Sequence, residues 1–412
     1  MLHGQGVQLA AQFTYFVVIA HVLGPKGYGT FVACTAVVIA VAPFSPIGAG
    51  QLLVKYSARN QDVFPIYFGN AIIITVGSGL LWTLLLLLLR PILFPSSVTT
   101  VMLIAVAIAD LICTQLTAIC NLAFMALERP RDSANVLVTA AVLRVLASLL
   151  LFAFAASPLR WAQLYLTAAL IAAVYQIFSV IRKSSVPRPD LKLIYPSLRE
   201  GFHFATSLTA QTVYDNIDKT MLARLSTLES AAIYAVAYRF IEASMLPIRA
   251  LTYSTYPEFF RQGQGGVTAT YRFARRILNR SVLYGLFVTV ALFAGAGLLP
   301  LIFGKGYVES AAALRWLCPL PLIKSVHAFL TDTLTGANFQ AERSTIQIGV
   351  AVFNILINLW LIRVYSWRGA SWSSIVTDFL LMATLYLLIR WHVRRERNAL
   401  AGEVFPSSSA EG

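Results

Sequence analysis

The chain has 412 residues, of which 58% are hydrophobic and 12% are charged, and its mean hydropathy is +0.71. A soluble domain needs a charged exterior, so this composition excludes a water-soluble globular protein and indicates a polytopic membrane protein. The formal net charge is +14, but the charges cluster in short loops between apolar runs. That distribution argues against nucleic-acid binding and is typical of residues that orient a membrane protein.

Windowed hydropathy predicts an all-α chain with about twelve membrane-spanning segments. The first apolar run, residues 7–23, lacks the basic stretch of a cleavable signal peptide, so we expect it to be a spanning helix. The runs 98–126 and 308–335 are longer than a straight crossing needs, and we expect them to tilt or to project beyond the bilayer. The expected spans are residues 5–22, 30–53, 65–89, 98–126, 134–155, 160–181, 200–222, 231–257, 281–303, 308–335, 344–363 and 369–391.

Two stretches about 200 residues apart occupy equivalent positions. Residues 20–33 and residues 223–235 each close one expected span and open the next, and a proline-bearing span follows each of them. The sequence therefore predicts two six-helix bundles, related as parallel repeats around a central cavity. The predicted division is an N-terminal bundle 1–182, a cytoplasmic linker 183–199, a C-terminal bundle 200–392 and a cytoplasmic tail 393–412.

Prolines interrupt several of the expected spans. Each proline removes an intrahelical hydrogen bond and bends the helix, and in transporters such breaks act as hinges. A passive kink is the equally open alternative. The prolines are Pro43, Pro46, Pro247, Pro319 and Pro321, and Gly48 and Gly50 follow the second of them.

Lysine and arginine are distributed unequally between the two ends of the expected spans. One side carries about 19 of these residues and the other about 8, so the first side is expected to be cytoplasmic, with both termini inside. Five further cations lie within the spans, where an ionisable side chain costs about 2.5 kcal/mol or more. They are Arg144, Arg239, Arg249, Arg315 and Lys324.

Acidic residues also lie inside the expected spans, and they leave two interpretations of the cations open. Buried carboxylates could neutralise the cations as dry ion pairs. Alternatively the cations line a hydrated cavity, where arginine grips a phosphate bidentately and lysine acts as a point charge. The acidic residues are Asp110, Asp218, Glu242, Asp332 and Asp378.

Short motifs in a fixed order resemble those of Wzx-type polysaccharide and oligosaccharide flippases, the polysaccharide transporter family within the MATE/MurJ-like MOP superfamily. The run Leu-Gly-Pro-x-x-Tyr-Gly-x-Phe at 23–31 resembles the first periplasmic turn of that family. Asn216-x-Asp218 and the run Ile-Tyr-Ala-Val-Ala-Tyr-Arg at 233–239 resemble its seventh and eighth helices. Three more stretches resemble later turns: residues 302–307, 336–338 and 369–371.

The resemblance implies a flippase of the bacterial inner membrane with a MOP/MATE-like fold. Such a protein moves a polyprenyl-pyrophosphate-linked oligosaccharide between leaflets by alternating access, for the biosynthesis of surface polysaccharide such as exopolysaccharide. Its expected partners are that glycan, membrane lipid and a polysaccharide polymerase or export machinery, but no nucleic acid. On this interpretation substrate binding falls to Arg144, Arg239, Arg249, Arg315 and Lys324, and coupling to H⁺ or Na⁺ falls to Asp218 and Glu242.

Two other functions fit part of the sequence. An ion-coupled drug or cation antiporter of the same fold would need an acid-dominated cavity, whereas cations are in excess here. A membrane-embedded glycosyltransferase or polymerase would need catalytic acids or a large periplasmic loop. We expect no enzyme, cofactor or metal site, because the sequence has no phosphate-binding Gly-x4-Gly-Lys-Ser/Thr loop and no Cys/His cluster with ligand spacing. The pattern His327-x4-Asp332 lies inside a span and is taken as coincidence.

Overall fold

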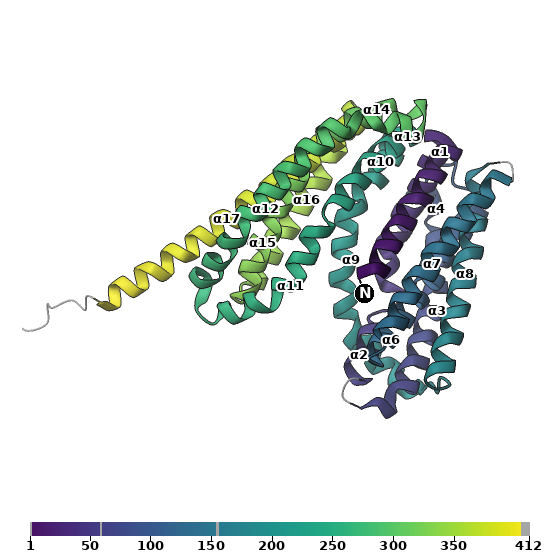
Figure 1. Ribbon diagram of the computed structural model, residues 1–412, viewed down its shortest axis with the longest axis horizontal. Coiled ribbons are helices and arrows are strands. Elements are labelled where there is room, and N and C mark those ends of the chain that lie inside the picture. The colour runs from purple at the N-terminus through teal and green to yellow at the C-terminus, as the bar shows by residue number, and fades with distance from the viewer. Residues whose placement is uncertain (1, 58–59, 154–155, 405–412) are drawn as a thin grey trace, which may run out of the picture. The chain divides into compact units, whose positions relative to one another are not determined.

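The computed structural model describes the backbone of residues 2–57, 60–153 and 156–404, and the side chains there except those of residues 2–9, 200, 203–204, 206–215, 253, 257 and 399–404. These residues form seventeen α-helices joined by short connections, and no β-strand occurs among them. Figure 1 traces the helices along the chain. The predicted all-α membrane fold is confirmed.

Eight helical segments within the described ranges are long and apolar enough to cross a membrane. A ninth counts if Leu228–Ser244 and Leu246–Tyr256, which bend by 41° against each other, form one span. The first segment, Ala10–Ser57, covers the expected span 30–53 and most of the span 5–22. The expected span 308–335 is divided between α14 and α15, which have 10 and 17 residues. The number twelve therefore stays a prediction.

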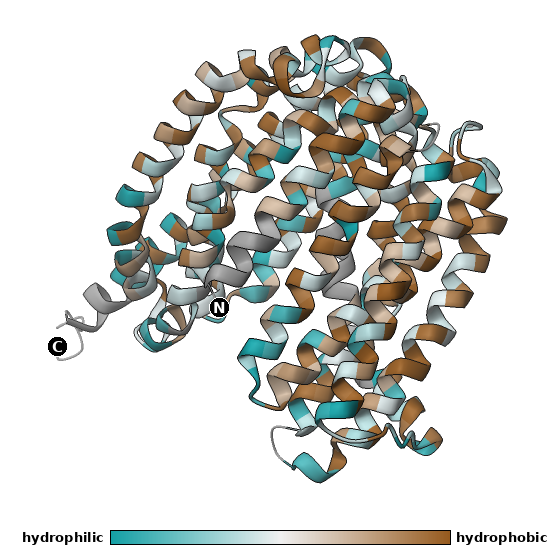
Figure 2. Ribbon diagram, turned by 45° about the vertical axis from the view of Figure 1, so that its right-hand side comes forward, coloured by the Kyte–Doolittle hydropathy of each residue, from teal (hydrophilic) through white to brown (hydrophobic). Residues whose placement is uncertain are grey.

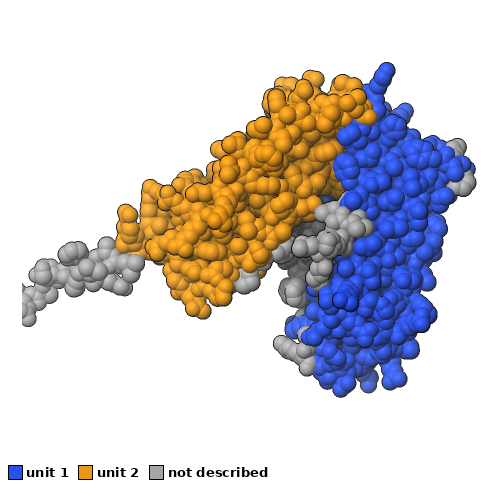
Figure 3. Space-filling model, in the orientation of Figure 1, with its two compact units in different colours: residues 1–232, 302–306 blue, residues 233–301, 307–412 orange. Residues whose placement is uncertain are grey.

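Contacts divide the chain into two compact units, which have different colours in Figure 3. Unit 1 comprises Met1–Ala232 and Ile302–Gly306, and unit 2 comprises Ile233–Leu301 and Tyr307–Gly412. The division into bundles predicted from the sequence, with its linker at 183–199, stays a prediction.

The helices of unit 1 begin and end where the sequence provides turn and cap residues. Gly24 adopts φ 65° before Pro25 and bends α1. Ser157 accepts a hydrogen bond from the Arg160 backbone at 3.2 Å and caps α8. The helices are α1 (Leu2–Val41), α2 (Ala49–Ser57), α3 (Phe64–Leu88), α4 (Arg90–Leu93), α5 (Thr100–Ala107), α6 (Thr114–Ala126), α7 (Pro130–Leu150), α8 (Pro158–Lys183) and α9 (Ile194–Leu225), with α10 (Leu228–Ser244) beginning in this unit.

Two helices of unit 1 are interrupted, and only one of these interruptions was predicted from the sequence. The prolines of the second expected span do break the helix, into a 3-10 turn at Ala42–Phe44 and a bend before α2. The long expected span 98–126 contains a π-helical turn, Ile108–Cys113, between α5 and α6, which hydropathy does not reveal. Such π-turns are often found at functional sites.

The core of unit 1 lies where α2, α3 and α6 pack together. Leu53, Phe68 and Phe124 are almost fully buried in this cluster. Glycines allow α9 to approach the broken segment closely: a Cβ on Gly201 would lie 1.8 Å from the Ile47 carbonyl oxygen. Small residues at such contacts let backbones come together in membrane proteins.

Unit 2 is built around α12, α15 and α17, which pack on one another, with α11 on α12 and α15 and with α16 on α17. Phe259, Leu330 and Leu385 lie in its buried clusters. Its further helices are α11 (Leu246–Gly263), α12 (Gly266–Gly295), α14 (Val308–Leu317), α15 (Leu320–Gly336), α16 (Gln340–Tyr365) and α17 (Trp367–Val404), and α13 (Leu299–Phe303) bridges the boundary in sequence.

Apolar side chains are exposed along much of the helical surface. In α3, Leu80, Leu81 and Leu84 are each more than half exposed, and in α12 Leu283 and Phe287 are 69% exposed. Much of the helical length is brown in Figure 2, while teal gathers toward helix ends and connections. Because a soluble protein rarely exposes such surface, these faces are those that contact lipid.

Candidate functional site

A buried ion pair joins two membrane-embedded helices of unit 2. Lys324 on α15 places its Nζ 3.1 Å from Oδ2 and 3.4 Å from Oδ1 of Asp378 on α17. Their side chains are 13% and 3% exposed. His327, one turn further along α15, places Nε2 3.4 Å from Asp378 Oδ1. One carboxylate therefore faces two basic side chains in the interior of the membrane domain, where charges usually mark a function.

Tyrosines of α10 extend this cluster, which we call the Lys324 cluster (Lys324, His327, Asp378, Tyr234 and Tyr238). The Tyr238 ring lies 5.9 Å from Lys324 Nζ, within the range of a cation–π contact. Tyr234 stacks on Tyr238 with ring centroids 5.4 Å apart. The Tyr234 hydroxyl lies 2.9 Å from Ser374 Oγ, one turn before Asp378. Three helices thus contribute polar groups to one place.

A ladder of amides and hydroxyls continues along the contact between α16 and α17. Asn354 Nδ2 donates to Thr377 Oγ1 at 3.2 Å, and Asn358 Nδ2 donates to Asn354 Oδ1 at 3.1 Å. Ser373 Oγ donates to Asn358 Oδ1 at 2.5 Å. Hydrogen bonds of this kind hold membrane helices together, so the ladder fixes α17 and with it the Asp378 carboxylate.

A second polar cluster lies in unit 1 at the π-turn. The Tyr165 hydroxyl donates to Asp110 Oδ1 at 2.5 Å, and both side chains are buried. Arg144 on α7 donates to Thr114 Oγ1 at 3.1 Å, and its guanidinium lies 5.4 Å from the centre of the Tyr165 ring. No described residue donates to Asp110 Oδ2, although that oxygen is buried. The π-turn thus brings a carboxyl group, a phenol and a guanidinium together.

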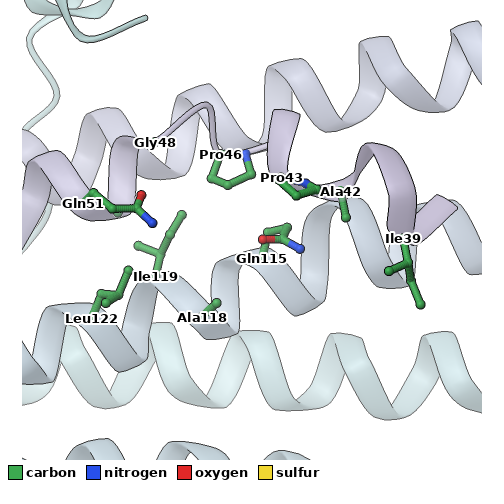
Figure 4. A pocket seen from close by; sticks show the side chains of 11 residues that line it. Ile39, Ala42, Pro43, Pro46, Gly48, Gln51, Gln115, Ala118, Ile119 and Leu122 are labelled. Carbon is green, nitrogen blue, oxygen red and sulfur yellow. The ribbon is translucent and has the colours of Figure 1, made fainter. Parts of the chain in front are cut away.

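A cavity of about 290 Å³ opens beside the break between α1 and α2. Figure 4 shows the carboxamides of Gln51 on α2 and Gln115 on α6 among apolar side chains such as Pro46 and Ile119. Gln115 Nε2 donates to the Asp110 backbone carbonyl at 3.3 Å, which ties the cavity wall to the π-turn. The volume lies at the lower end of the range for ligand pockets.

The seven predicted site residues lie in different surroundings. Arg239 pairs with Glu242 at 3.0 Å on α10, with side chains 41% and 26% exposed. Lys324 is in the buried pair with Asp378. Lys324 thus has a buried ion pair of the kind that the sequence left as one of two interpretations, whereas the pair of Arg239 is partly exposed.

The remaining predicted residues lie on four different helices. Arg249 is exposed on α11, and Arg315 is exposed on α14, 5.7 Å from the centre of the Phe293 ring. Asp218 is half-buried on α9 in unit 1, as Arg144 is on α7. The assignment of substrate binding to the five cations, and of ion coupling to Asp218 and Glu242, stays a prediction.

Sequence reasoning missed His327 and Tyr165 as parts of these clusters. His327 was considered only with Asp332, whereas its close carboxylate is Asp378, which lies 51 residues further along the chain. A signal was present, because Lys324 and His327 are spaced i, i+3 and so lie on one helical face. No comparable signal linked Tyr165 to Asp110, since their helices meet only in the folded chain.

Comparison with solved structures shows that the fold is that of MOP-superfamily transporters. An inward-facing multidrug resistance MATE family transporter aligns with a TM-score of 0.75 at 13% identity, over 98% of this chain and 99% of that one. The lipid II flippase MurJ, in an inward closed conformation, aligns with a TM-score of 0.71 at 12% identity, over 93% and 87% of the two chains. At these identities the likeness concerns the fold alone.

Sequence comparison gives a family. A protein of Escherichia coli (strain K12) named "Putative O-antigen transporter" is 21% identical over 228 residues, which are 54% of this chain and 55% of that protein. The chain thus matches about half the length of this relative. A family model described as polysaccharide biosynthesis protein matches residues 1–262, well over half of the sequence. The chain therefore belongs to the polysaccharide biosynthesis protein family.

Proposed function

We propose that this protein is a flippase that moves a polyprenyl-pyrophosphate-linked oligosaccharide across a bacterial inner membrane by alternating access. Its family, the transporter name of its E. coli relative and the fold that it shares with a lipid II flippase support a transporter of a lipid-linked glycan. The proposal needs a group that receives a phosphorylated headgroup inside the membrane domain. The observation that carries the proposal is the Lys324 cluster, whose lysine can bind such a headgroup.

The Lys324 cluster has the composition of a site that exchanges one anion for another. Lys324 pairs with the Asp378 carboxylate, and His327 lies beside the same carboxylate. A lysine in a poorly hydrated place needs a counter-charge, and a phosphate offers more charge than the Asp378 carboxylate. The headgroup would therefore take the place of Asp378 beside Lys324, and Asp378 would return when the headgroup leaves.

The proposal includes coupling to H⁺ or Na⁺ through Asp218 or Glu242. It also includes a role in surface polysaccharide biosynthesis, alongside a polymerase.

The test separates loss of folding from loss of transport. Lys324→Met and Asp378→Leu each leave one charge buried without its partner, so each lowers the free energy of unfolding by about 3–5 kcal/mol. The double substitution removes both charges and restores much of that loss. We expect the double variant to regain its thermal midpoint but to export less than about a tenth of the glycan, measured as surface polysaccharide in cells that lack the wild-type gene.

The control removes a pair of the same two residue types at a more exposed place. Lys183 and Asp132 pair near the ends of α8 and α7, with side chains 40% and 20% exposed. Lys183→Met combined with Asp132→Leu should leave export within about twofold of wild type, because exposed pairs contribute little. Normal export by the double variant at Lys324 and Asp378 would refute the proposed role of this cluster.

A further inference from the structure

Eight arginines gather on two helices of unit 2 that pack against each other. All eight side chains are exposed. α12 and α17 are in contact, and the arginines lie toward the beginning of α12 and the end of α17. We call this set the arginine surface; it consists of Arg272, Arg275, Arg276, Arg280, Arg390, Arg394, Arg395 and Arg397.

The arginines follow helical stripes. Arg272, Arg276 and Arg280 are spaced i, i+4, i+8 along α12. Arg390, Arg394 and Arg397 are spaced i, i+4, i+7 along α17. Both spacings place side chains on one face of a helix. The signal that orients a protein in the membrane depends on how many charges a loop carries, and not on which face of a helix they occupy. The alignment of these arginines is therefore not explained by membrane orientation alone.

A direct contact fixes the two helices against each other at this end. Glu396 of α17 accepts hydrogen bonds from the backbone N–H groups of Val267 at 2.8 Å and Thr268 at 2.9 Å, in the first turn of α12. The Thr268 hydroxyl donates to the same carboxylate at 2.6 Å. A carboxylate at a helix N-terminus satisfies donors that have no partner within the helix. The arginines of both helices are therefore held at one end of the unit.

The described carboxylates near this end already have partners. Glu396 caps α12, and Glu342 lies 2.8 Å from His392 Nε2. Glu258 at the end of α11 pairs with Arg261. No ion pair within the described part of the chain involves an arginine of this surface. Among the described residues, the positive charge of this surface is therefore not neutralised by an ion pair and can attract an anionic ligand.

Exposed aromatic rings accompany the arginines. Trp391 is 53% exposed and Tyr386 is 40% exposed on α17. The Arg395 guanidinium lies 5.5 Å from the Trp391 ring, and the Arg390 guanidinium lies 6.0 Å from the Tyr386 ring. Tryptophan and tyrosine concentrate where the membrane meets water. These rings therefore place the arginine surface at the depth of lipid headgroups.

The length of α17 supports the same placement. Its 38 residues extend about 57 Å, whereas the hydrocarbon core of a bilayer is about 30 Å thick. Even a tilted helix of this length continues past the core. The part that emerges carries the arginines, so its charges lie beside the phosphates of the adjacent leaflet.

We propose that the arginine surface binds the phosphates of anionic phospholipids and so fixes the ends of α12 and α17 to the adjacent leaflet. Clusters of four to eight basic residues next to a membrane helix bind acidic lipid in this way. Each arginine contributes about a fivefold gain in affinity for an anionic surface. The proposal stands whether or not the chain is a flippase.

The experiment uses the purified full-length protein in detergent, with its thermal midpoint followed during titration with short-chain phosphatidylglycerol or phosphatidylcholine. A lipid that binds the folded state raises the midpoint, and one that binds more tightly does so at a lower concentration. We expect phosphatidylglycerol to raise the midpoint at lower concentration than phosphatidylcholine, and 0.5 M salt to weaken its effect, since salt at about that strength screens surface charge.

Two variants and a control test the surface. Arg394→Gln with Arg397→Gln, and separately Arg272→Gln with Arg276→Gln, should each weaken the phosphatidylglycerol effect about 25-fold. Arg394→Lys with Arg397→Lys should keep it within about threefold, because the charge remains. The control, Arg363→Gln with Arg368→Gln, neutralises two exposed arginines at the far ends of α16 and α17 and should leave it unchanged.

Several results would overturn the proposal. The two glutamine variants could respond to phosphatidylglycerol as wild type does, or the control could weaken as much as they do. Phosphatidylcholine could be as effective as phosphatidylglycerol in the wild type. Inorganic pyrophosphate, added alone, could raise the midpoint while phosphatidylglycerol does not. That last result would assign the arginines to a soluble phosphate and not to a lipid surface.

Discussion

At the residue scale, the buried charged groups of the membrane domain have ion-pair or hydrogen-bond partners. Asp378 faces Lys324 and His327, and Asp110 receives the Tyr165 hydroxyl. These arrangements differ in exposure from the Arg239–Glu242 pair, whose side chains are 41% and 26% exposed. A buried pair is expensive to break, whereas an exposed pair contributes about 0–1 kcal/mol. The energetic contribution of each pair therefore depends on how deeply its side chains are buried, and not only on the presence of a partner.

The sequence predicted which charges lie in the membrane but not which of them meet. The i, i+3 spacing placed Arg239 and Glu242 on one face, and the structure has that pair at 3.0 Å. Lys324 and Asp378 are 54 residues apart, and their contact depends on how α15 packs on α17. Spacing along one helix is visible in a sequence, whereas the packing of separate helices is not.

We predict that Tyr165→Phe destabilises unit 1. It removes the hydroxyl that donates to Asp110 Oδ1, and no described group donates to Oδ2, so the buried carboxyl group loses its hydrogen-bond donor. The expected loss is about 1–3 kcal/mol, measured as a lower midpoint of thermal unfolding. Tyr175→Phe is the control, because Tyr175 lies on the same helix and is 55% exposed. Equal midpoints for the two variants would contradict the prediction.

At the element scale, the helix breaks position the polar groups of unit 1. The prolines at 43 and 46 were visible as breakers in the sequence, and a 3-10 turn with a following bend is found there. The π-turn at 108–113 was not, because its residues are as apolar as the helices around it except for Asp110. Hydropathy detects how long an apolar run is, but it does not register a change in hydrogen-bond pattern within that run.

We predict that Gly201→Ala is disruptive, because α9 rests against the broken segment through backbone atoms. The added Cβ would lie 1.8 Å from the Ile47 carbonyl oxygen, and backbone cannot move aside as a flexible side chain can. The overlap should cost about 1–3 kcal/mol or more, seen as a lower thermal midpoint.

The matched control for that substitution is Gly77→Ala in α3. A Cβ at Gly77 meets nothing within 4 Å. Alanine is also the better helix former by about 1 kcal/mol, so the midpoint should stay or rise slightly. If both alanine variants unfolded at the wild-type temperature, the close approach of α9 would not be a structural constraint.

At the scale of the whole molecule, the family match includes the tyrosines of the Lys324 cluster but not its charged residues. The family model matches residues 1–262, whereas Lys324, His327 and Asp378 lie beyond that range. The fold comparison spans almost the complete chain, at 98% coverage for the MATE family transporter. The likeness of fold therefore covers Lys324, His327 and Asp378 as well, although the family model does not.

We predict that the chain ends on the cytoplasmic side of the membrane. The basis is the uneven count of Lys and Arg, about 19 against about 8, on the two sides of the expected spans. A green fluorescent protein fused after residue 412 should fluoresce, and alkaline phosphatase at the same place should stay inactive. The opposite pair of results would reverse the orientation. Fusions at Lys26 and Lys305, expected on the other side, provide the control.

The contact of Glu396 with the start of α12 has a consequence for shortening the protein. This carboxylate accepts hydrogen bonds from the backbone N–H groups of Val267 and Thr268, which lie 129 and 128 residues earlier in the chain. The turn of α17 that carries Glu396 therefore contributes to the stability of the fold. A stop codon after residue 398 keeps the hydrogen bonds of Glu396, whereas one before residue 396 removes them. A chain that stops before residue 396 should therefore unfold at a lower temperature than one that stops after residue 398.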